Sequence, residues 1–179
     1  MENKFSLKTV IRIALVLMLV SGLSAALIIA LNKVTAPIIV QNNIDKENNS
    51  LAQIYAGAEF ETLEEGNGTI LKVAKATKNN ELLGYVYKVT GKNAYGTITL
   101  LVGVTNGEVV KVVFLENSES FASKVEDHVN SAYAPNKVNT ENVADVDTKC
   151  GATYGAKTVK EMISQALEHY SNMTNGGNE

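Results

Sequence analysis

The hydrophobic pattern separates an apolar N-terminal segment from a mixed remainder. Residues 13–31, "IALVLMLVSGLSAALIIAL", contain no charged residue. As an α-helix they would extend about 28 Å, which is enough to cross the hydrocarbon core of a bilayer. Lys4, Lys8 and Arg12 precede this run, whereas a single lysine follows it closely. Because basic residues stay on the cytoplasmic side, we expect residues 1–12 in the cytoplasm and the chain beyond the transmembrane helix outside it.

A cleaved signal peptide is the alternative interpretation of this segment. The apolar region of a signal peptide is usually only about 7–15 residues long. The run at 13–31 is longer, and no small-residue cleavage motif follows it. We therefore favour a permanent anchor and a single-pass protein of the cell membrane.

Helical spacing of apolar residues continues after the span. Residues 32–57 predict a juxtamembrane helix with Thr35 as its N-cap, Pro37 in its first turn and Gly57 as its stop signal. This helix would connect the membrane span to the domain that follows.

The period of the pattern changes to two within residues 58–171, the predicted extracytoplasmic domain. Four runs rich in Val, Ile, Thr and Tyr predict strands of an antiparallel sheet. These runs are residues 69–77, 82–90, 97–105 and 108–115. The dipeptide Asn106-Gly107 predicts a type I′ turn between the last two strands.

Two amphipathic segments flank the predicted strands on their C-terminal side. Residues 120–133 and 155–171 carry apolar side chains at helical spacing, and residues 172–179 form a polar tail. Strands and helices do not alternate as βαβ units, so the fold class is α+β, an antiparallel sheet with flanking helices.

Composition narrows the possible chemistry. The net charge is −3, from 16 basic and 19 acidic residues, and no long basic block is present to bind nucleic acid. The single cysteine has no CxxC or Cys/His cluster around it, so we expect neither a disulfide nor a metal site. His128 and His169 lack a second ligand at metal-binding spacing. Redox chemistry would therefore need an organic cofactor.

The stretch "DTKCGATYGAKTV", residues 147–159, is the strongest candidate for a functional motif. It places Thr153 immediately before a predicted helix, whose unpaired N–H groups and dipole attract an anion. Lys157 and Lys160 would add positive charge nearby. A phosphate on Thr153 would be stabilised there; in the alternative interpretation, Thr153 is only a helix cap.

The same stretch resembles the flavin attachment motif D-x-x-[Ser/Thr]-G-A-T of the FMN-binding domain family. Asp147, Gly151, Ala152 and Thr153 match this motif, and Cys150 stands where the family has Ser or Thr. The resemblance implies an FMN-binding domain in which FMN is joined to Thr153 by a phosphoester. A dedicated flavin transferase attaches the FMN in that family.

The order of segments along the chain also resembles the G-type subunit of Rnf-type electron transport complexes and, more distantly, the C-type subunit of the sodium-pumping NADH:quinone reductase. In the loop "NSESFASK", residues 117–124, Glu119 and Ser120 match the family pattern H-x-E-T-P-G-L-G. The resemblance implies that these two residues, together with the Cys150–Thr153 segment, contact the flavin.

The implied function is that of a membrane-anchored flavoprotein subunit rather than a complete enzyme, so no catalytic residue is assigned. It would relay electrons through covalent FMN within an ion-translocating, ferredoxin- and NAD-linked complex, with the other membrane subunits as partners. Two alternatives remain at this point. One is a stand-alone FMN protein that delivers electrons to extracellular acceptors, and the other is an anchored binding module without redox function.

Overall fold

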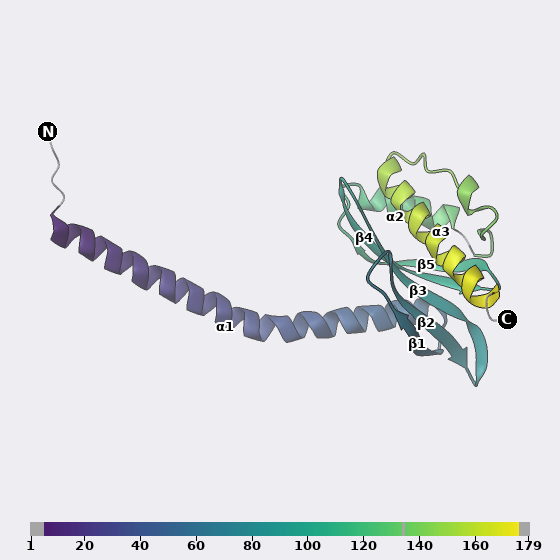
Figure 1. The fold of residues 1–179 in the computed structure, drawn as a ribbon, viewed down its shortest axis with the longest axis horizontal. Coiled ribbons are helices and arrows are strands. Elements are labelled where there is room, and N and C mark those ends of the chain that lie inside the picture. The colour runs from purple at the N-terminus through teal and green to yellow at the C-terminus, as the bar shows by residue number, and fades with distance from the viewer. Residues whose placement is uncertain (1–5, 134, 176–179) are drawn as a thin grey trace. The chain divides into compact units, whose positions relative to one another are not determined.

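A computed structural model of the protein describes residues 6–133 and 135–175. A long N-terminal helix precedes a five-stranded antiparallel sheet with two further α-helices, which confirms the α+β prediction (Figure 1). The chain divides into two compact units, and the boundary between them lies between Asp45 and Lys46.

Helix α1, Leu7–Ile54, is continuous where the sequence predicts two helices. It contains a stretch that is long and apolar enough to cross a membrane, a property that signal sequences share. The predicted helix start at Thr35 is wrong. The Thr35 hydroxyl donates to the carbonyl oxygen of Leu31 at 2.9 Å, and Pro37 lies inside the helix. A threonine that bonds the preceding turn is satisfied within a helix and need not cap a new one.

The sheet is an antiparallel meander in which each strand pairs with its neighbours in the chain. Its strands are β1 Glu59–Glu65, β2 Ile70–Lys78, β3 Glu81–Asn93, β4 Gly96–Thr105 and β5 Glu108–Asn117. At the β4–β5 turn, Asn106 and Gly107 have φ angles of 53° and 81°. Both signs are those of a type I′ turn, so the predicted hairpin is confirmed.

Strand β1 is the element that the sequence pattern did not predict. Its sequence, EFETLEE, is rich in glutamate, and all but one of its side chains are exposed. β1 pairs only with β2 and forms an edge of the sheet. Charged residues are common on edge strands because they discourage pairing with other chains.

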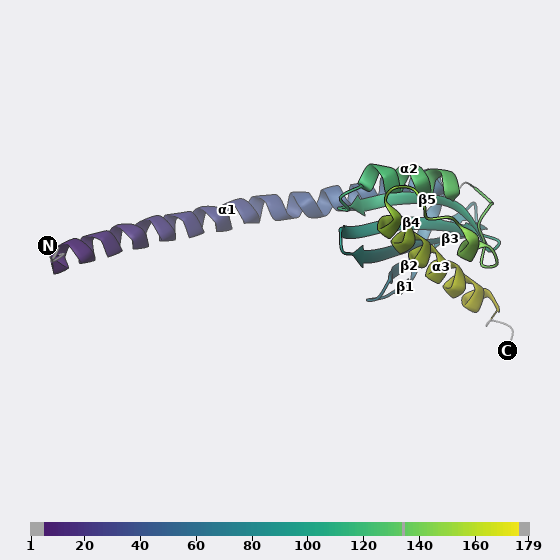
Figure 2. The same cartoon turned by 90° about the horizontal axis from the view of Figure 1, so that it is seen from above.

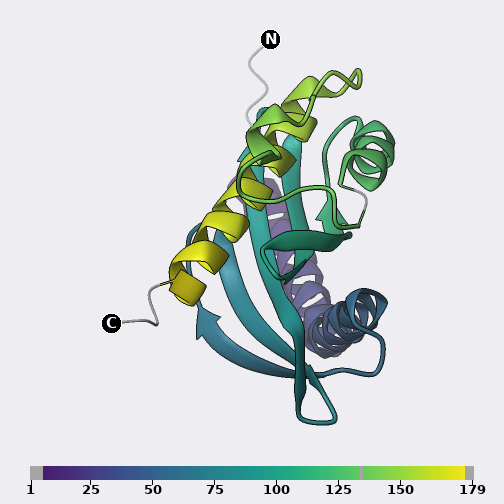
Figure 3. The same cartoon turned by 90° about the vertical axis from the view of Figure 1, so that its right-hand side faces the viewer.

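Both faces of the sheet are covered, which explains why β4 is buried along most of its length rather than at alternate positions. Helices α2, Ala122–Ala132, and α3, Thr153–Asn175, pack on one face around the larger core cluster. The last turns of α1 pack Leu51 and Ile54 on the other face (Figure 3). Figure 2 shows α2 alongside β5 and α3 crossing the sheet.

The observed helix bounds adjust the predicted ones. Helix α2 lies within the predicted range 120–133. Helix α3 begins at Thr153, two residues before the predicted start, and continues to Asn175. The first part of the predicted polar tail is therefore helical, and residues 176–179 lie outside the described part of the chain.

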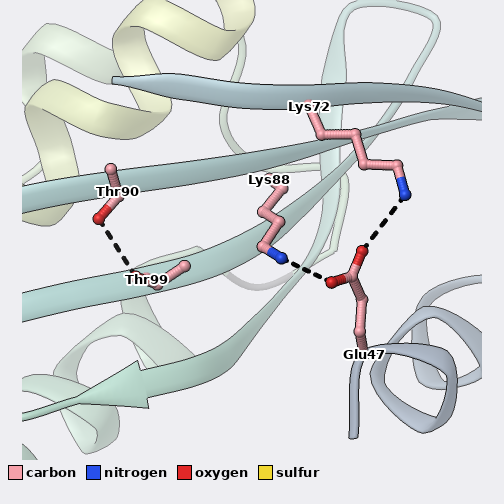
Figure 4. A network of polar contacts seen from close by, with 5 residues as sticks. All are labelled: Glu47, Lys72, Lys88, Thr90 and Thr99. Carbon is pink, nitrogen blue, oxygen red and sulfur yellow. Dashed lines mark hydrogen bonds and ion pairs between the residues drawn. The ribbon is translucent and has the colours of Figure 1, made fainter. Parts of the chain in front are cut away.

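A partly buried ion-pair cluster joins the end of α1 to the sheet (Figure 4). Glu47 extends between two lysines, 2.6 Å from Lys88 Nζ and 3.5 Å from Lys72 Nζ. Burial alone would raise the pKa of Glu47, but the hydrogen bonds and charges of Lys88 and Lys72 outweigh burial and lower it. The cluster thus holds residue 47 on the sheet as a carboxylate.

Candidate functional site

The segment before α3 is folded by local hydrogen bonds. The Asp147 side chain accepts a bond from the Lys149 N–H at 3.0 Å, and the Cys150 N–H donates to the carbonyl of Thr148 at 3.1 Å. Gly151 then adopts a φ of 77°, a conformation that side-chain-bearing residues rarely take. The positive φ at this position therefore explains why the motif has glycine there.

Thr153 is the first residue of α3. The carbonyl of the preceding residue, Ala152, accepts the first helical bond from Ala156 at 3.1 Å, so Ala152 occupies the cap position. The half-buried Thr153 side chain makes no hydrogen bond with any residue in 6–133 or 135–175. Its hydroxyl does not cap the helix in this structure and is free to react or bind.

Thr153 lines a pocket of about 250 Å³. Three segments distant in sequence form its walls: the β3–β4 turn, the connection from β5 to α2, and the start of α3. The lining residues are Tyr95, Glu119, Phe121, Gly151, Ala152, Thr153 and Tyr154. The structure thus brings Glu119 together with Gly151, Ala152 and Thr153 in the lining of one pocket.

Aromatic side chains form the rim of the pocket. Tyr95, Phe121 and Tyr154 are between 44% and 61% exposed. The rings of Tyr95 and Tyr154 are tilted against each other with centroids 5.4 Å apart. Outside α1, the large apolar side chains exposed in the described residues are these three together with Leu63 and Leu82. Exposed aromatic surface is therefore concentrated at the site, where a flat ring system can pack against it.

Glu119 forms the polar wall of the pocket and is only 6% exposed. One carboxylate oxygen accepts a hydrogen bond from the Phe121 N–H at 3.1 Å, and the other is 3.4 Å from Asn93 Nδ2. Asn93 also donates to the Thr158 hydroxyl at 3.2 Å, which in turn donates to the Tyr154 carbonyl at 3.0 Å. This chain of bonds ties the loop residue Glu119 to β3 and α3.

Gly155 lets this carboxylate approach α3. A Cβ at position 155 would lie 2.7 Å from Glu119 Oε1 and 2.5 Å from Val125 Cγ2. A side chain there would displace Glu119 or α2. Neither Gly155 nor Asn93 was predicted from the sequence to belong to the site.

Two predicted flavin contacts lie outside the pocket lining. Ser120 is exposed and does not line the pocket. Cys150 is half-buried and packs against the core on the α2 and α3 face. This cysteine therefore supports the turn before α3, and its position explains why a small, weakly polar side chain is tolerated there.

The prediction that Lys160 adds charge beside Thr153 is wrong. Its ammonium donates to the carbonyl oxygens of Ala144 at 2.6 Å and Val146 at 3.0 Å, so it holds the short 3-10 helix Val143–Asp145. Helical spacing placed Lys160 on α3, but the loop that would use its charge was not predictable from the sequence.

Lys124 is a basic residue at the site that was not predicted from the sequence. Its Nζ lies 5.5 Å from the centroid of the Phe121 ring, and a Cβ at Gly151 would lie 3.6 Å from that Nζ. Lys124 does not match the family pattern compared with residues 117–124, so only the packing of α2 beside the Gly151 turn reveals it.

The described residues contain no group of three side chains suited to a metal ion. His169 instead pairs with Glu64, with Nε2 3.1 Å from the carboxylate. The pocket itself offers the hydroxyl of Thr153 and the carboxylate of Glu119 as polar groups.

Comparison with known proteins shows what the C-terminal part of the chain is similar to. Residues 94–168, which include every residue of the pocket, match the family model described as FMN-binding domain. This part of the chain is similar to that family. None of the curated proteins matches the chain.

The pocket fits the parts of FMN. The free Thr153 hydroxyl at a helix N-terminus suits the phosphate, and the exposed rings of Tyr95, Phe121 and Tyr154 suit the isoalloxazine ring. Pockets that enclose drug-sized ligands measure about 300–1,000 Å³. At about 250 Å³, this pocket would enclose only part of FMN.

Proposed function

We propose that this FMN-binding domain holds FMN covalently, by a phosphoester to Thr153, and relays electrons through it. The observation that carries the proposal is Thr153, whose hydroxyl has no hydrogen-bond partner in the described chain and which lines a pocket at the start of α3. It lies in a segment that matches the family's attachment motif at Asp147, Gly151 and Ala152 as well.

Each pocket residue has a role in this proposal. The free N–H groups at the start of α3 stabilise the phosphate, and the small side chain of Ala152 leaves room for it. The aromatic rim binds the ring system, and the fixed carboxylate of Glu119 accepts a hydrogen bond from the cofactor. FMN supplies the electron-transfer chemistry, while the protein supplies position and electrostatics.

Attachment joins the Thr153 oxygen to phosphorus and releases the hydroxyl proton. Free FMN is a poor phosphoryl donor, so the reaction needs a flavin donor with a nucleotide leaving group. We therefore propose a flavin transferase as a partner. A covalent bond suits a site outside the cytoplasm, where a dissociated cofactor would be lost.

We further propose that the domain is extracytoplasmic and works as the G-type subunit of an Rnf-type ion-translocating complex. Support comes from the apolar stretch of α1, from the basic residues in 1–12, and from the order of segments along the chain. A shallow pocket that leaves part of the flavin exposed suits exchange of electrons with neighbouring subunits. Copurification of other membrane subunits with the tagged chain would support the complex, whereas a chain that purifies alone would favour the stand-alone alternative.

The Thr153 hydroxyl is the group whose removal tests attachment. The full-length chain, coexpressed with a flavin transferase, should gain the mass of one FMN less one water, and Thr153→Ala should gain nothing. Because the Thr153 hydroxyl bonds no described residue, the substitution should change the free energy of unfolding by no more than about 0.5 kcal/mol. Intact-mass spectrometry and thermal unfolding measure the two effects.

Thr148→Ala is the matched control, because it removes a hydroxyl five residues upstream in the same segment. This variant should keep the full mass gain. A wild-type chain that stays colourless, or a Thr153→Ala chain that still gains FMN, would contradict the proposal and favour an anchored module without flavin.

A further inference from the structure

Lys124 places an ammonium group beside the attachment site with no anionic partner. The side chain is exposed, and within residues 6–133 and 135–175 its ammonium makes no ion pair or hydrogen bond. Its neighbours are the face of the Phe121 ring, 5.5 Å from Nζ, and the backbone at Gly151. Both neighbours line the pocket that contains Thr153.

The nearest pocket carboxylate does not neutralise this lysine. Glu119 directs its oxygens to the Phe121 N–H and to Asn93, and no described ion pair links it to Lys124. On α2 itself, Glu126 accepts a hydrogen bond from the Asn117 side chain at 3.0 Å, and Asp127 is exposed. The positive charge is therefore available at the pocket.

The geometry of Gly151 also accommodates the lysine. A Cβ at position 151 would lie 3.6 Å from Lys124 Nζ and 3.7 Å from its Cδ, which is ordinary van der Waals contact, so the lysine side chain passes close beside this turn. The positive φ of Gly151 already disfavours other residues. The motif glycine thus turns the chain, and the turn brings the start of α3 beside Lys124.

We propose that Lys124 is a positioning residue whose ammonium pairs with the phosphate of the flavin on Thr153. This inference rests on the proposed attachment and names the cation of that site. Packing of the lysine on Phe121 restricts its side chain, so less conformational freedom is lost when the ion pair forms. The N–H groups of α3 and the Lys124 ammonium would then approach the phosphate from two elements.

The test compares Lys124→Gln and Lys124→Arg in the full-length chain with Lys137→Gln. Lys137 is the matched control because it is an exposed lysine that does not line the pocket. Two quantities are measured: the initial rate of FMN incorporation at limiting transferase, by intact mass, and the ³¹P resonance of the attached phosphodiester. The incorporation rate is taken at low and high salt.

Lys124→Gln should slow incorporation about two- to fivefold at low salt, and the difference should shrink at high salt as the charges are screened. It should also move the ³¹P resonance, whereas Lys124→Arg and Lys137→Gln should resemble the wild type.

A resonance and a rate unchanged in Lys124→Gln would overturn the inference while leaving attachment intact. If Lys124→Arg fails as Lys124→Gln does, the positive charge is not what matters and the inference is also wrong. A wild type without FMN would instead contradict the proposed function itself.

Discussion

The polar groups around Glu47 and those around Thr153 differ in how completely they are paired. On the face covered by α1, the Glu47 carboxylate has a partner on each oxygen, Lys72 and Lys88. At the start of α3, the Thr153 hydroxyl and the Lys124 ammonium have no partner in the described residues. Both regions are built from ordinary side chains on the same scaffold.

This difference indicates which region is built for stability and which for binding. Polar groups that are not exposed are normally paired, because leaving them unpaired costs free energy. The Glu47 cluster follows this rule, since each carboxylate oxygen has a lysine partner. The Thr153 pocket retains a half-buried hydroxyl without a described partner beside exposed aromatic rings, which is expected where a ligand completes the structure.

The largest effect on stability is expected where the pocket wall meets α3. Gly155→Val should destabilise the domain by about 2–3 kcal/mol, because its side chain has to displace Val125 and the buried carboxylate of Glu119. Denaturant unfolding of the full-length chain in detergent measures this loss. The displaced Glu119 should also disturb the bound flavin's absorption spectrum.

Lys157→Val is the control for that substitution, since it places the same β-branched residue on the exposed side of the same helix. It should cost well under about 1 kcal/mol. Equal losses for the two variants would mean that α3 does not depend on close contact at position 155, and that the pocket wall is not fixed in advance.

The sequence pattern predicted the elements whose signal is local. Period-two runs predicted four of the five strands, and Asn106-Gly107 predicted the β4–β5 turn because both residues tolerate positive φ. Strand β1 was not predicted because its sequence is rich in glutamate and lacks a period-two apolar pattern. It forms a strand by pairing with β2 at the edge of the sheet, which its own residues do not indicate. The helix boundary at Thr35 failed because a threonine can also bond within a helix.

The candidate site was predictable only in part for the same reason. Thr153, Gly151 and Ala152 are contiguous and form a motif, so the sequence points to them directly. Lys124 and Asn93 come from other elements and become neighbours of the motif only when the sheet and α2 are assembled. Lys160 is the opposite case. It is close to the motif in sequence, but its ammonium binds a carbonyl oxygen of another loop.

A smaller effect on stability is expected at the Glu47 cluster. Glu47→Gln should lower the free energy of unfolding by about 1 kcal/mol at pH 7, because it removes a partly buried carboxylate from two lysines. The folded-state pKa of Glu47 lies below its ordinary value of 4.5, so this stability is present above that value and is lost as the pH falls through the folded pKa.

Denaturant unfolding at several pH values measures this contribution. The gap between wild type and Glu47→Gln should close in acid, whereas the exposed edge-strand variant Glu61→Gln should differ little from wild type at neutral pH. A gap that persists unchanged below the folded pKa would show that the ionised carboxylate is not the source of the stability.

The smallest effect on stability is expected at the rim of the open pocket, where the effect on the cofactor should be clearest. Replacing Tyr95 and Tyr154 together with leucine should change the free energy of unfolding by less than about 1 kcal/mol, because both rings are exposed. Tyrosine quenches flavin fluorescence on contact, so the attached flavin should become brighter while the mass gain stays complete. The exposed leucine variant Leu82→Ala, on β3, is the control and should leave the fluorescence unchanged. A flavin that stays equally dim without the tyrosines would mean that the ring lies elsewhere, and that the exposed aromatic rim meets something other than the cofactor.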